Sequence, residues 1–190
     1  MATPAEALCR LLEILDKMEI SYAIGGSSAS SVHGIPRTTA DVDLVVDLSL
    51  DQINDFASEL KADFYVEPDM IRSALARGRA FNLIHFKSAY KFDLFPLRRD
   101  EFSRTEFARR RFTLLRSLGP DPIECAVASA EDTILRKLEW YRAGGETSER
   151  QWNDLRGVLR VSGDKLDREY LGTWAKYLKV DDLLDRLLNE

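Results

Sequence analysis

Apolar and polar positions follow two different periods along the first two-thirds of the chain. Leucines recur at helical spacing over 7–18, directly after a Thr3-Pro4 helix start. Runs with strand-like apolar positions lie at 21–24, 41–47, 63–66, 81–86, 91–97, 113–118 and 123–128. Further helices are expected over 27–33, from 49 or 51 to 60, over 68–77 and over 100–111. The pattern predicts a mixed sheet with helices between its strands.

The pattern becomes helical at Ser129. A capping sequence at Ser129-Ala130-Glu131-Asp132 begins a helix to about 143, which Gly144-Gly145 ends. Helices are also expected over 148–161, 167–178 and 181–188. We therefore predict an α+β fold, with a mixed α/β core at 1–128 and a helical subdomain at 129–190 packed on it. Trp140, Trp152 and Trp174 are interpreted as part of the core that joins the helical part to the sheet, with a base-stacking platform as the alternative.

Composition and charge narrow the function classes. The 190 residues are 45% hydrophobic and 31% charged, and the net charge of -5 argues against a dedicated nucleic-acid binder. Cys9 and Cys125 lie far apart in sequence and suggest neither a zinc site nor a redox pair. No secretion signal is seen, and no apolar run approaches the roughly 20 residues of a membrane span. These features predict a cytoplasmic protein without a membrane partner.

Three aspartates are the chemically informative residues. Asp41 and Asp43 lie two apart in a predicted strand, so their side chains share a face. Asp93 is the single acid of the 91–97 strand. If these strands are neighbours, three carboxylates converge, and such oxygens suit Mg²⁺ or Mn²⁺. Two such ions about 4 Å apart serve phosphoryl and nucleotidyl transfer, which makes the three acids candidate catalytic and metal-binding residues.

A glycine-rich turn precedes these acids. Gly25-Gly26-Ser27 stands between a predicted strand and a predicted helix, where backbone amides can approach a phosphate closely. Arg37 precedes Asp41 and is a candidate for a forked contact to phosphate, with a structural salt bridge as the alternative. These four residues are the first candidates for binding a nucleotide.

The order of these motifs resembles the nucleotidyltransferase superfamily, which includes polymerase-β-like enzymes. The segment GGSSASSVHGIPRTTADVDLVV most resembles AbiEii-like toxin nucleotidyltransferases and their uncharacterised bacterial relatives. It is also similar to aminoglycoside nucleotidyltransferases. The resemblance covers roughly residues 20–97. It implies a mixed sheet with flanking helices, metal binding by Asp41, Asp43 and Asp93, and triphosphate binding by Gly26 and Ser27.

The helical part adds two candidates through the same resemblance. Lys137 in EDTILRKLEWYR and Asp154 in SERQWNDLRGVL stand at positions comparable to those of the AbiEii-like pattern. The resemblance implies that Lys137 contacts the triphosphate and that Asp154 acts on the acceptor hydroxyl or fixes Lys137. An ion pair between two helices is the alternative interpretation.

The function that we predict is metal-dependent transfer of a nucleoside monophosphate from a nucleoside triphosphate to an acceptor hydroxyl. RNA, a protein side chain and a small molecule are the open acceptor classes, and the resemblance adds a toxin role with an antitoxin protein as partner. A seven-arginine run over 98–116 is either a solvated surface or a guide for a polyanion such as RNA. The alternative functions are a non-catalytic nucleotide-binding module of a regulatory or toxin–antitoxin pair, and a metal-dependent phosphohydrolase.

Overall fold

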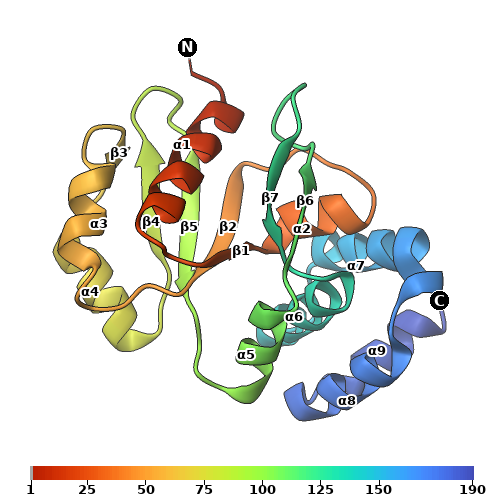
Figure 1. Cartoon of the computed structure of the whole chain (residues 1–190). Helices are drawn as coiled ribbons and strands as arrows, with labels where there is room; N and C mark the ends of the chain where they lie inside the picture. Colours follow the sequence, from red (N-terminus) through yellow and green to blue (C-terminus); the bar gives the residue numbers. More distant parts are fainter. Residues whose placement is uncertain (1) are drawn as a thin grey trace.

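The fold is built around one mixed sheet in the computed structural model, which describes residues 2–190. Its seven strands are β1 (Tyr22–Ile24), β2 (Asp41–Val46), β3 (Phe64–Tyr65), β4 (Phe81–His85), β5 (Lys91–Pro96), β6 (Arg111–Leu115) and β7 (Ile123–Val127). The order is β3-β4-β5-β2-β1-β7-β6 (Figure 1). β2 pairs with β5 and β1 pairs with β7 in parallel, and the other neighbours are antiparallel. The predicted α+β class is confirmed.

Helices connect these strands and form the C-terminal part. They are α1 (Pro4–Lys17), α2 (Gly26–His33), α3 (Ile53–Leu60), α4 (Pro68–Arg77), α5 (Glu101–Ala108), α6 (Ala130–Ala143), α7 (Glu149–Ser162), α8 (Arg168–Leu178) and α9 (Asp181–Leu188). A 3₁₀ turn at Gly163–Lys165 follows α7. None of these helices, within residues 2–190, is long and apolar enough to cross a membrane.

The predicted transition from α5 to β6 is wrong. The helix expected over 100–111 ends at Ala108, and the next strand begins at Arg111 instead of residue 113. Arg111–Leu115 pairs along its whole length with Ile123–Val127 in an antiparallel ladder. The helix-favouring arginines are overridden because long-range strand pairing supplies the backbone hydrogen bonds.

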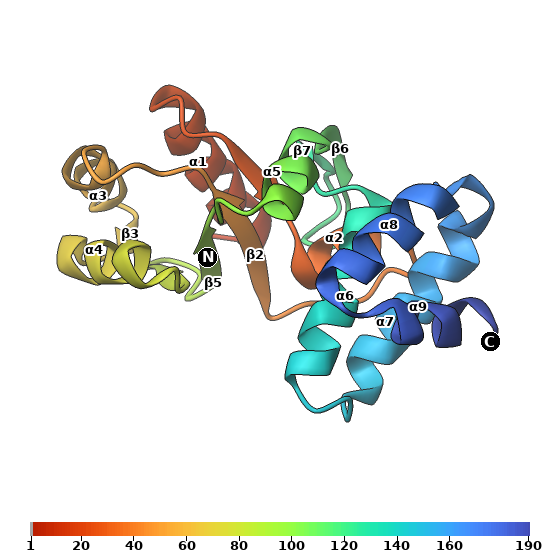
Figure 2. The same ribbon diagram turned by 90° about the horizontal axis from the view of Figure 1, so that it is seen from below.

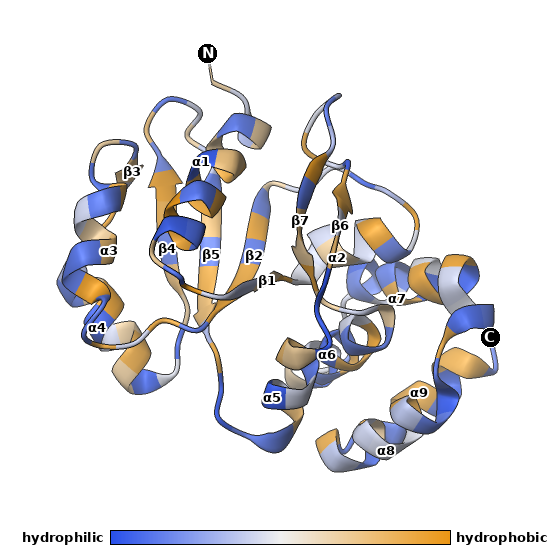
Figure 3. Ribbon diagram, in the orientation of Figure 1, coloured by the Kyte–Doolittle hydropathy of each residue, from blue (hydrophilic) through white to orange (hydrophobic). Residues whose placement is uncertain are grey.

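The two faces of the sheet differ in chemistry. Val42, Leu44 and Val46 of β2 are fully buried, whereas the alternate positions stay partly exposed. The buried residues belong to one apolar cluster with α1, α3 and α4, which therefore cover this face. Hydrophilic and hydrophobic residues alternate along the first half of β2 and β5, and the outer side of α3 is mostly hydrophilic (Figure 3). Asp41 and Asp43 lie on the opposite face, outside this cluster.

A second apolar cluster holds the C-terminal helices together. It draws its buried residues from α6 to α9, and Phe102 of α5 joins them. Seen from below, these helices gather at the end of the molecule opposite α3 and α4 (Figure 2). The boundary between residues 128 and 129 remains a prediction, although Phe102 shows that α5 packs with the helices that follow the boundary.

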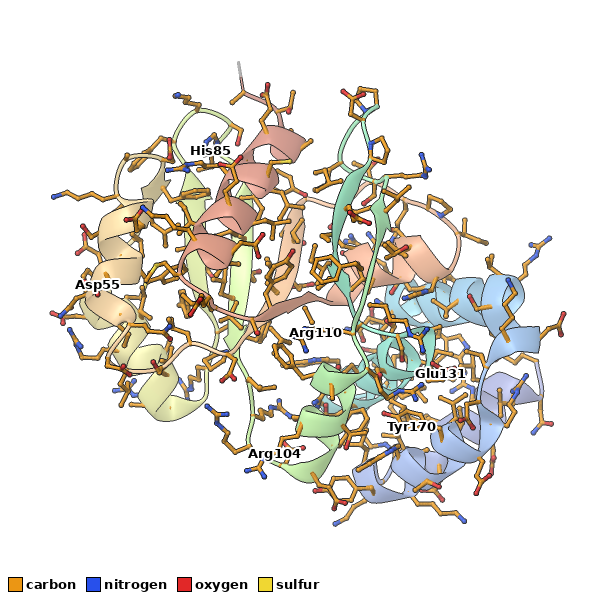
Figure 4. All side chains as sticks on the ribbon, in the orientation of Figure 1. Asp55, His85, Arg104, Arg110, Glu131 and Tyr170 are labelled. Carbon is orange, nitrogen blue, oxygen red and sulfur yellow. The ribbon has the colours of Figure 1, made fainter. Side chains whose placement is uncertain are left out.

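A polar network joins α5, α6 and α8 beside this cluster. The guanidinium of Arg109 contacts Glu131 at 3.1 Å and lies 3.9 Å from the ring centroid of Tyr170. The Tyr170 hydroxyl donates to Asp132 at 2.6 Å. Glu131 and Tyr170 are labelled in this region of Figure 4. These contacts hold the start of α6 in place against α5 and α8.

α2 connects the sheet to the helical part through a close backbone contact. A Cβ atom at Gly34, where α2 ends, would lie 2.7 Å from the backbone carbonyl carbon of Gly157 in α7. Ser162 of α7 also donates its hydroxyl to the carbonyl of His33 at 2.7 Å. The segment that leads into β2 is therefore held against α7.

Replacing Gly34 tests this packing. Gly34→Ala should lower the free energy of unfolding by roughly 1–3 kcal/mol, the usual range for overpacking a close contact. Gly172→Ala in α8 is the matched control, because its Cβ would meet nothing within 4 Å and should stabilise the helix. Urea denaturation measures both variants. Equal stability of Gly34→Ala and the natural chain would contradict the close packing.

Candidate active site

Strand register brings the predicted acids together. In the parallel β2–β5 pair, Asp43 lies opposite Asp93 and Asp41 lies opposite Lys91. Residues paired in register point to the same side of a sheet, so all three carboxylates share one face. This is the face that α1, α3 and α4 leave uncovered. The structure thus places the three acids side by side, as the sequence predicts.

The glycine turn packs directly against Asp43. The amide of Gly25 donates to the carbonyl of Asp43 at 3.0 Å. Gly26 has a φ of +55°, and a Cβ there would lie 1.8 Å from a carboxylate oxygen of Asp43. Only glycine fits this position, because both the conformation and the close approach exclude a side chain. The first turn of α2, with its free amides and partial positive charge, therefore begins beside the acid.

Asp43 lies between two other negative charges, those of Asp41 and Asp93. Burial, followed by the neighbouring charges of Asp41 and Asp93, raises the pKa of Asp43 from 3.8 to about 6. Lys137 and Lys91 partly offset this rise. One carboxylate oxygen of Asp93 is buried without a hydrogen-bond partner among residues 2–190. Buried, crowded carboxylates are unfavourable unless positive charge lies among them.

The donor set suits a divalent cation. Three carboxylates offer hard oxygen ligands, and the unpartnered oxygen of Asp93 is free to accept a further contact. In the described part of the chain, however, no three acidic, His or Cys side chains already converge on one point as metal ligands do. The ammonium of Lys91 lies among them instead, 2.7 Å from Asp93 and 3.7 Å from Asp41.

The remaining predicted charged residues form a three-membered network. Both oxygens of Asp154 accept from the Arg37 guanidinium at 2.8 Å, and Lys137 donates to one of them at 2.8 Å. Burial opposes ionisation, but these hydrogen bonds lower the pKa of Asp154 below its usual value. Of the two roles inferred for Asp154, the contacts match the one in which it fixes Lys137. Arg37 and Lys137 both form ion pairs with Asp154, which is the alternative to phosphate binding that the sequence left open for each of them.

A cavity of about 520 Å³ lies in front of the acids. All predicted site residues except Asp93 line it, namely Gly25, Gly26, Ser27, Arg37, Asp41, Asp43, Lys137 and Asp154. Asp93 lies beside Asp43 in the next strand. The Ser27 hydroxyl is engaged with the Thr39 hydroxyl at 2.8 Å, so Ser27 offers its backbone amide more readily than its side chain.

Trp140 is a cavity residue that our sequence interpretation missed. It is 49% exposed, lines the cavity, and its ring lies 6.3 Å from that of Phe95. The core interpretation is wrong for Trp140, although it holds for Trp152, which is 4% exposed. The spacing of Trp140 from Lys137 could have indicated its position. Residues three apart on a helix share a face, and Lys137 lines the same cavity.

A buried acid–base pair extends the cavity wall further. Glu106 of α5 accepts from the Arg136 guanidinium of α6 at 2.8 Å, and both residues line the cavity. Burial raises the pKa of Glu106 to about 7, although Arg136 opposes the shift. In the sequence, Glu106 and Arg136 look like ordinary charged residues on the surface of two helices. The sequence alone therefore does not identify them as cavity residues.

Removing the charge of Asp43 should stabilise the metal-free protein. The carboxylate has a pKa of about 6 when folded and 3.8 ordinarily, so its ionisation opposes folding increasingly as pH rises between these values. Asp43→Asn should therefore be more stable than the natural chain by roughly 3 kcal/mol at pH 7.5, and the difference should shrink toward zero near pH 4.

Urea denaturation in EDTA at both pH values measures this difference. Asp55→Asn is the control, because Asp55 is an exposed residue of α3 (Figure 4), a helix that covers the opposite face of the sheet from the acids. If Asp43→Asn raises the free energy of unfolding by the same amount at both pH values, the crowding of charge at Asp43 is contradicted.

Comparisons with known proteins bear on the fold. No protein-family model and no curated protein matches the sequence. A solved antigenic nucleotidyltransferase-like protein from Paracoccidioides brasiliensis is 16% identical, with 98% of this chain and 94% of that chain covered and a TM-score of 0.54. ANT(2″)-Ia in complex with adenylyl-2″-tobramycin is 12% identical, with 90% and 94% covered and a TM-score of 0.54.

A further solved structure has a similar arrangement. The lincosamide antibiotic adenylyltransferase LnuA, bound to lincomycin, is 13% identical, with 85% of this chain and 99% of that chain covered and a TM-score of 0.53. Identities this low establish similarity of fold alone. Because the alignments span both the sheet and the C-terminal helices, this chain has the nucleotidyltransferase fold.

Proposed function

We propose that this protein transfers a nucleoside monophosphate from a nucleoside triphosphate to an acceptor hydroxyl. The observation that carries the proposal is the placement of Asp43 beside Asp93 in one register and against Gly26 at the start of α2. Carboxylates for a cation and amides for a phosphate therefore meet at one wall of a cavity. The fold shared with solved adenylyltransferases supports the same reaction class.

The acids, the glycine turn and Lys137 each have a role in this scheme. Asp41, Asp43 and Asp93 would hold Mg²⁺ or Mn²⁺, which when bound neutralises phosphate charge and favours ionisation of the acceptor hydroxyl. The backbone amides of the Gly25-Gly26-Ser27 turn bind phosphate oxygens. Lys137 lines the same cavity and lowers the pKa of Asp43, so its charge reaches the region where the triphosphate binds.

The reaction balances as an in-line displacement. The acceptor hydroxyl loses its proton to a base, its oxygen forms a bond to the α-phosphorus, and the bond to pyrophosphate breaks. Asp93 and Asp154 are the two carboxylates that could serve as this base. Asp154 is the weaker candidate because Arg37 and Lys137 hold it ionised with a lowered pKa. Asp93 retains one oxygen without a partner among residues 2–190.

The acceptor class is open between RNA, a protein and a small molecule. The names of LnuA and ANT(2″)-Ia associate those proteins with antibiotics, which favours testing small hydroxylated acceptors first. In the arginine run, Arg98, Arg99 and Arg109 are ion-paired with acids, which weakens the interpretation of the run as a guide for RNA. An AbiEii-like toxin role and an antitoxin partner remain predictions from motif resemblance.

A labelled-triphosphate assay tests the proposed reaction. The protein is incubated with each triphosphate, Mg²⁺ or Mn²⁺, and separate pools of RNA, protein and small hydroxylated compounds. We expect label transfer with release of pyrophosphate. Asp43→Asn should lower the rate by roughly a hundredfold or more, the scale of losing one electrostatic contact in an active site. Asp55→Asn, on the exposed surface of α3, should leave the rate unchanged.

Other outcomes identify the alternatives. Nucleotide binding without transfer to any pool would favour the non-catalytic nucleotide-binding module. Release of inorganic phosphate in place of pyrophosphate would favour a phosphohydrolase. Full activity of Asp43→Asn would contradict the assignment of the acids.

A further inference from the structure

Lys91 occupies an unusual position among the three acids. It is the first residue of β5 and lies opposite Asp41 in the β2–β5 register. Its ammonium is 2.7 Å from a carboxylate oxygen of Asp93 and 3.7 Å from one of Asp41. Residues two apart on a strand share a face, so the long Lys91 side chain folds over the acidic face rather than away from it.

These contacts differ from an ordinary surface ion pair. The Asp93 side chain is 16% exposed and that of Lys91 is 39% exposed, so one partner is largely removed from water. The other oxygen of Asp93 is buried without a partner in the described chain. Lys91 also reduces the charge repulsion felt by Asp43. One ammonium thus lies close to two of the carboxylates and partly relieves the charge repulsion at the third.

An ammonium and a divalent cation compete for the same charge. Oxygens that contact the ammonium of Lys91 are not free to surround a metal ion, and two neighbouring cations repel each other. The pair formed with Asp93 must therefore break, or lengthen, when an ion binds these acids. The stem of Lys91 is flexible and partly exposed, which allows the ammonium to leave toward solvent.

We propose that Lys91 is an internal counter-cation of the acidic site, which holds the acids together without metal and is displaced when a divalent cation binds. This inference rests on the proposed function, because it takes Asp41, Asp43 and Asp93 as the cation ligands. It assigns Lys91 a positioning role. The lysine stabilises the metal-free protein and sets the cation concentration at which the site fills.

Lys91→Met tests this role, because methionine keeps an apolar stem of similar length and removes the charge. Binding of Mn²⁺ without nucleotide is measured by calorimetry and by the electron paramagnetic resonance signal of free Mn²⁺. We expect Lys91→Met to bind Mn²⁺ roughly fivefold more tightly, the scale of one partly exposed charge pair. Its melting temperature in EDTA should fall, and its rise on adding Mn²⁺ should exceed that of the natural chain.

Two variants control for net charge and for side-chain length. Lys87→Met makes the same charge change in the turn between β4 and β5, at an exposed lysine that forms no ion pair within residues 2–190, and should bind Mn²⁺ as the natural chain does. Lys91→Arg keeps the charge and should retain the melting temperature in EDTA. Circular dichroism checks that each variant is folded.

The outcomes separate this inference from the proposed function. Mn²⁺ binding by the natural chain that Asp43→Asn abolishes, with equal or weaker affinity in Lys91→Met, would overturn the role of Lys91 alone. Mn²⁺ binding that Asp43→Asn leaves unchanged, or no Mn²⁺ binding by either the natural chain or Lys91→Met, would overturn the acids as cation ligands and the inference with them. Binding that appears only in Lys91→Met would support it.

Discussion

The parallel pairing of β2 with β5 is the contact on which the candidate site depends. It sets Asp43 opposite Asp93 and turns both side chains away from the apolar cluster under α1, α3 and α4. A slip of β5 by one residue would send Asp93 into that cluster and bring Phe92 or Leu94 beside Asp43. The buried side chains Phe92 and Leu94 therefore hold β5 in the register that places Asp93 beside Asp43.

Bringing like charges together opposes folding, and the surrounding residues limit this effect in two ways. Gly26 lets the start of α2 lie against the carboxylate of Asp43, where helix amides and partial positive charge face it. Lys91 and Lys137 add full positive charges from two different elements. The site is thus a region of the molecule where crowded like charges reduce stability, as is common at functional sites.

Alternating apolar positions were sufficient to predict which face of each strand carries Asp41, Asp43 and Asp93, because the period of a strand is fixed. The sequence did not reveal that Lys91 folds back over them, since a long flexible side chain has no preferred direction in a pattern of hydropathy. The start of β6 at Arg111 was missed because its partner in β7 decides it. Trp140 was misassigned because an apolar residue facing a cavity looks the same in sequence as one facing a core.

The network around Asp154 couples two regions that are distant along the chain. Asp154 of α7 binds Lys137 of α6 and also Arg37, which lies in the segment between α2 and β2. That segment leads directly into the acidic strand. Loss of either cation from Asp154 would therefore loosen the hold of α7 on the entrance to β2, and the seating of the C-terminal helices would change with it.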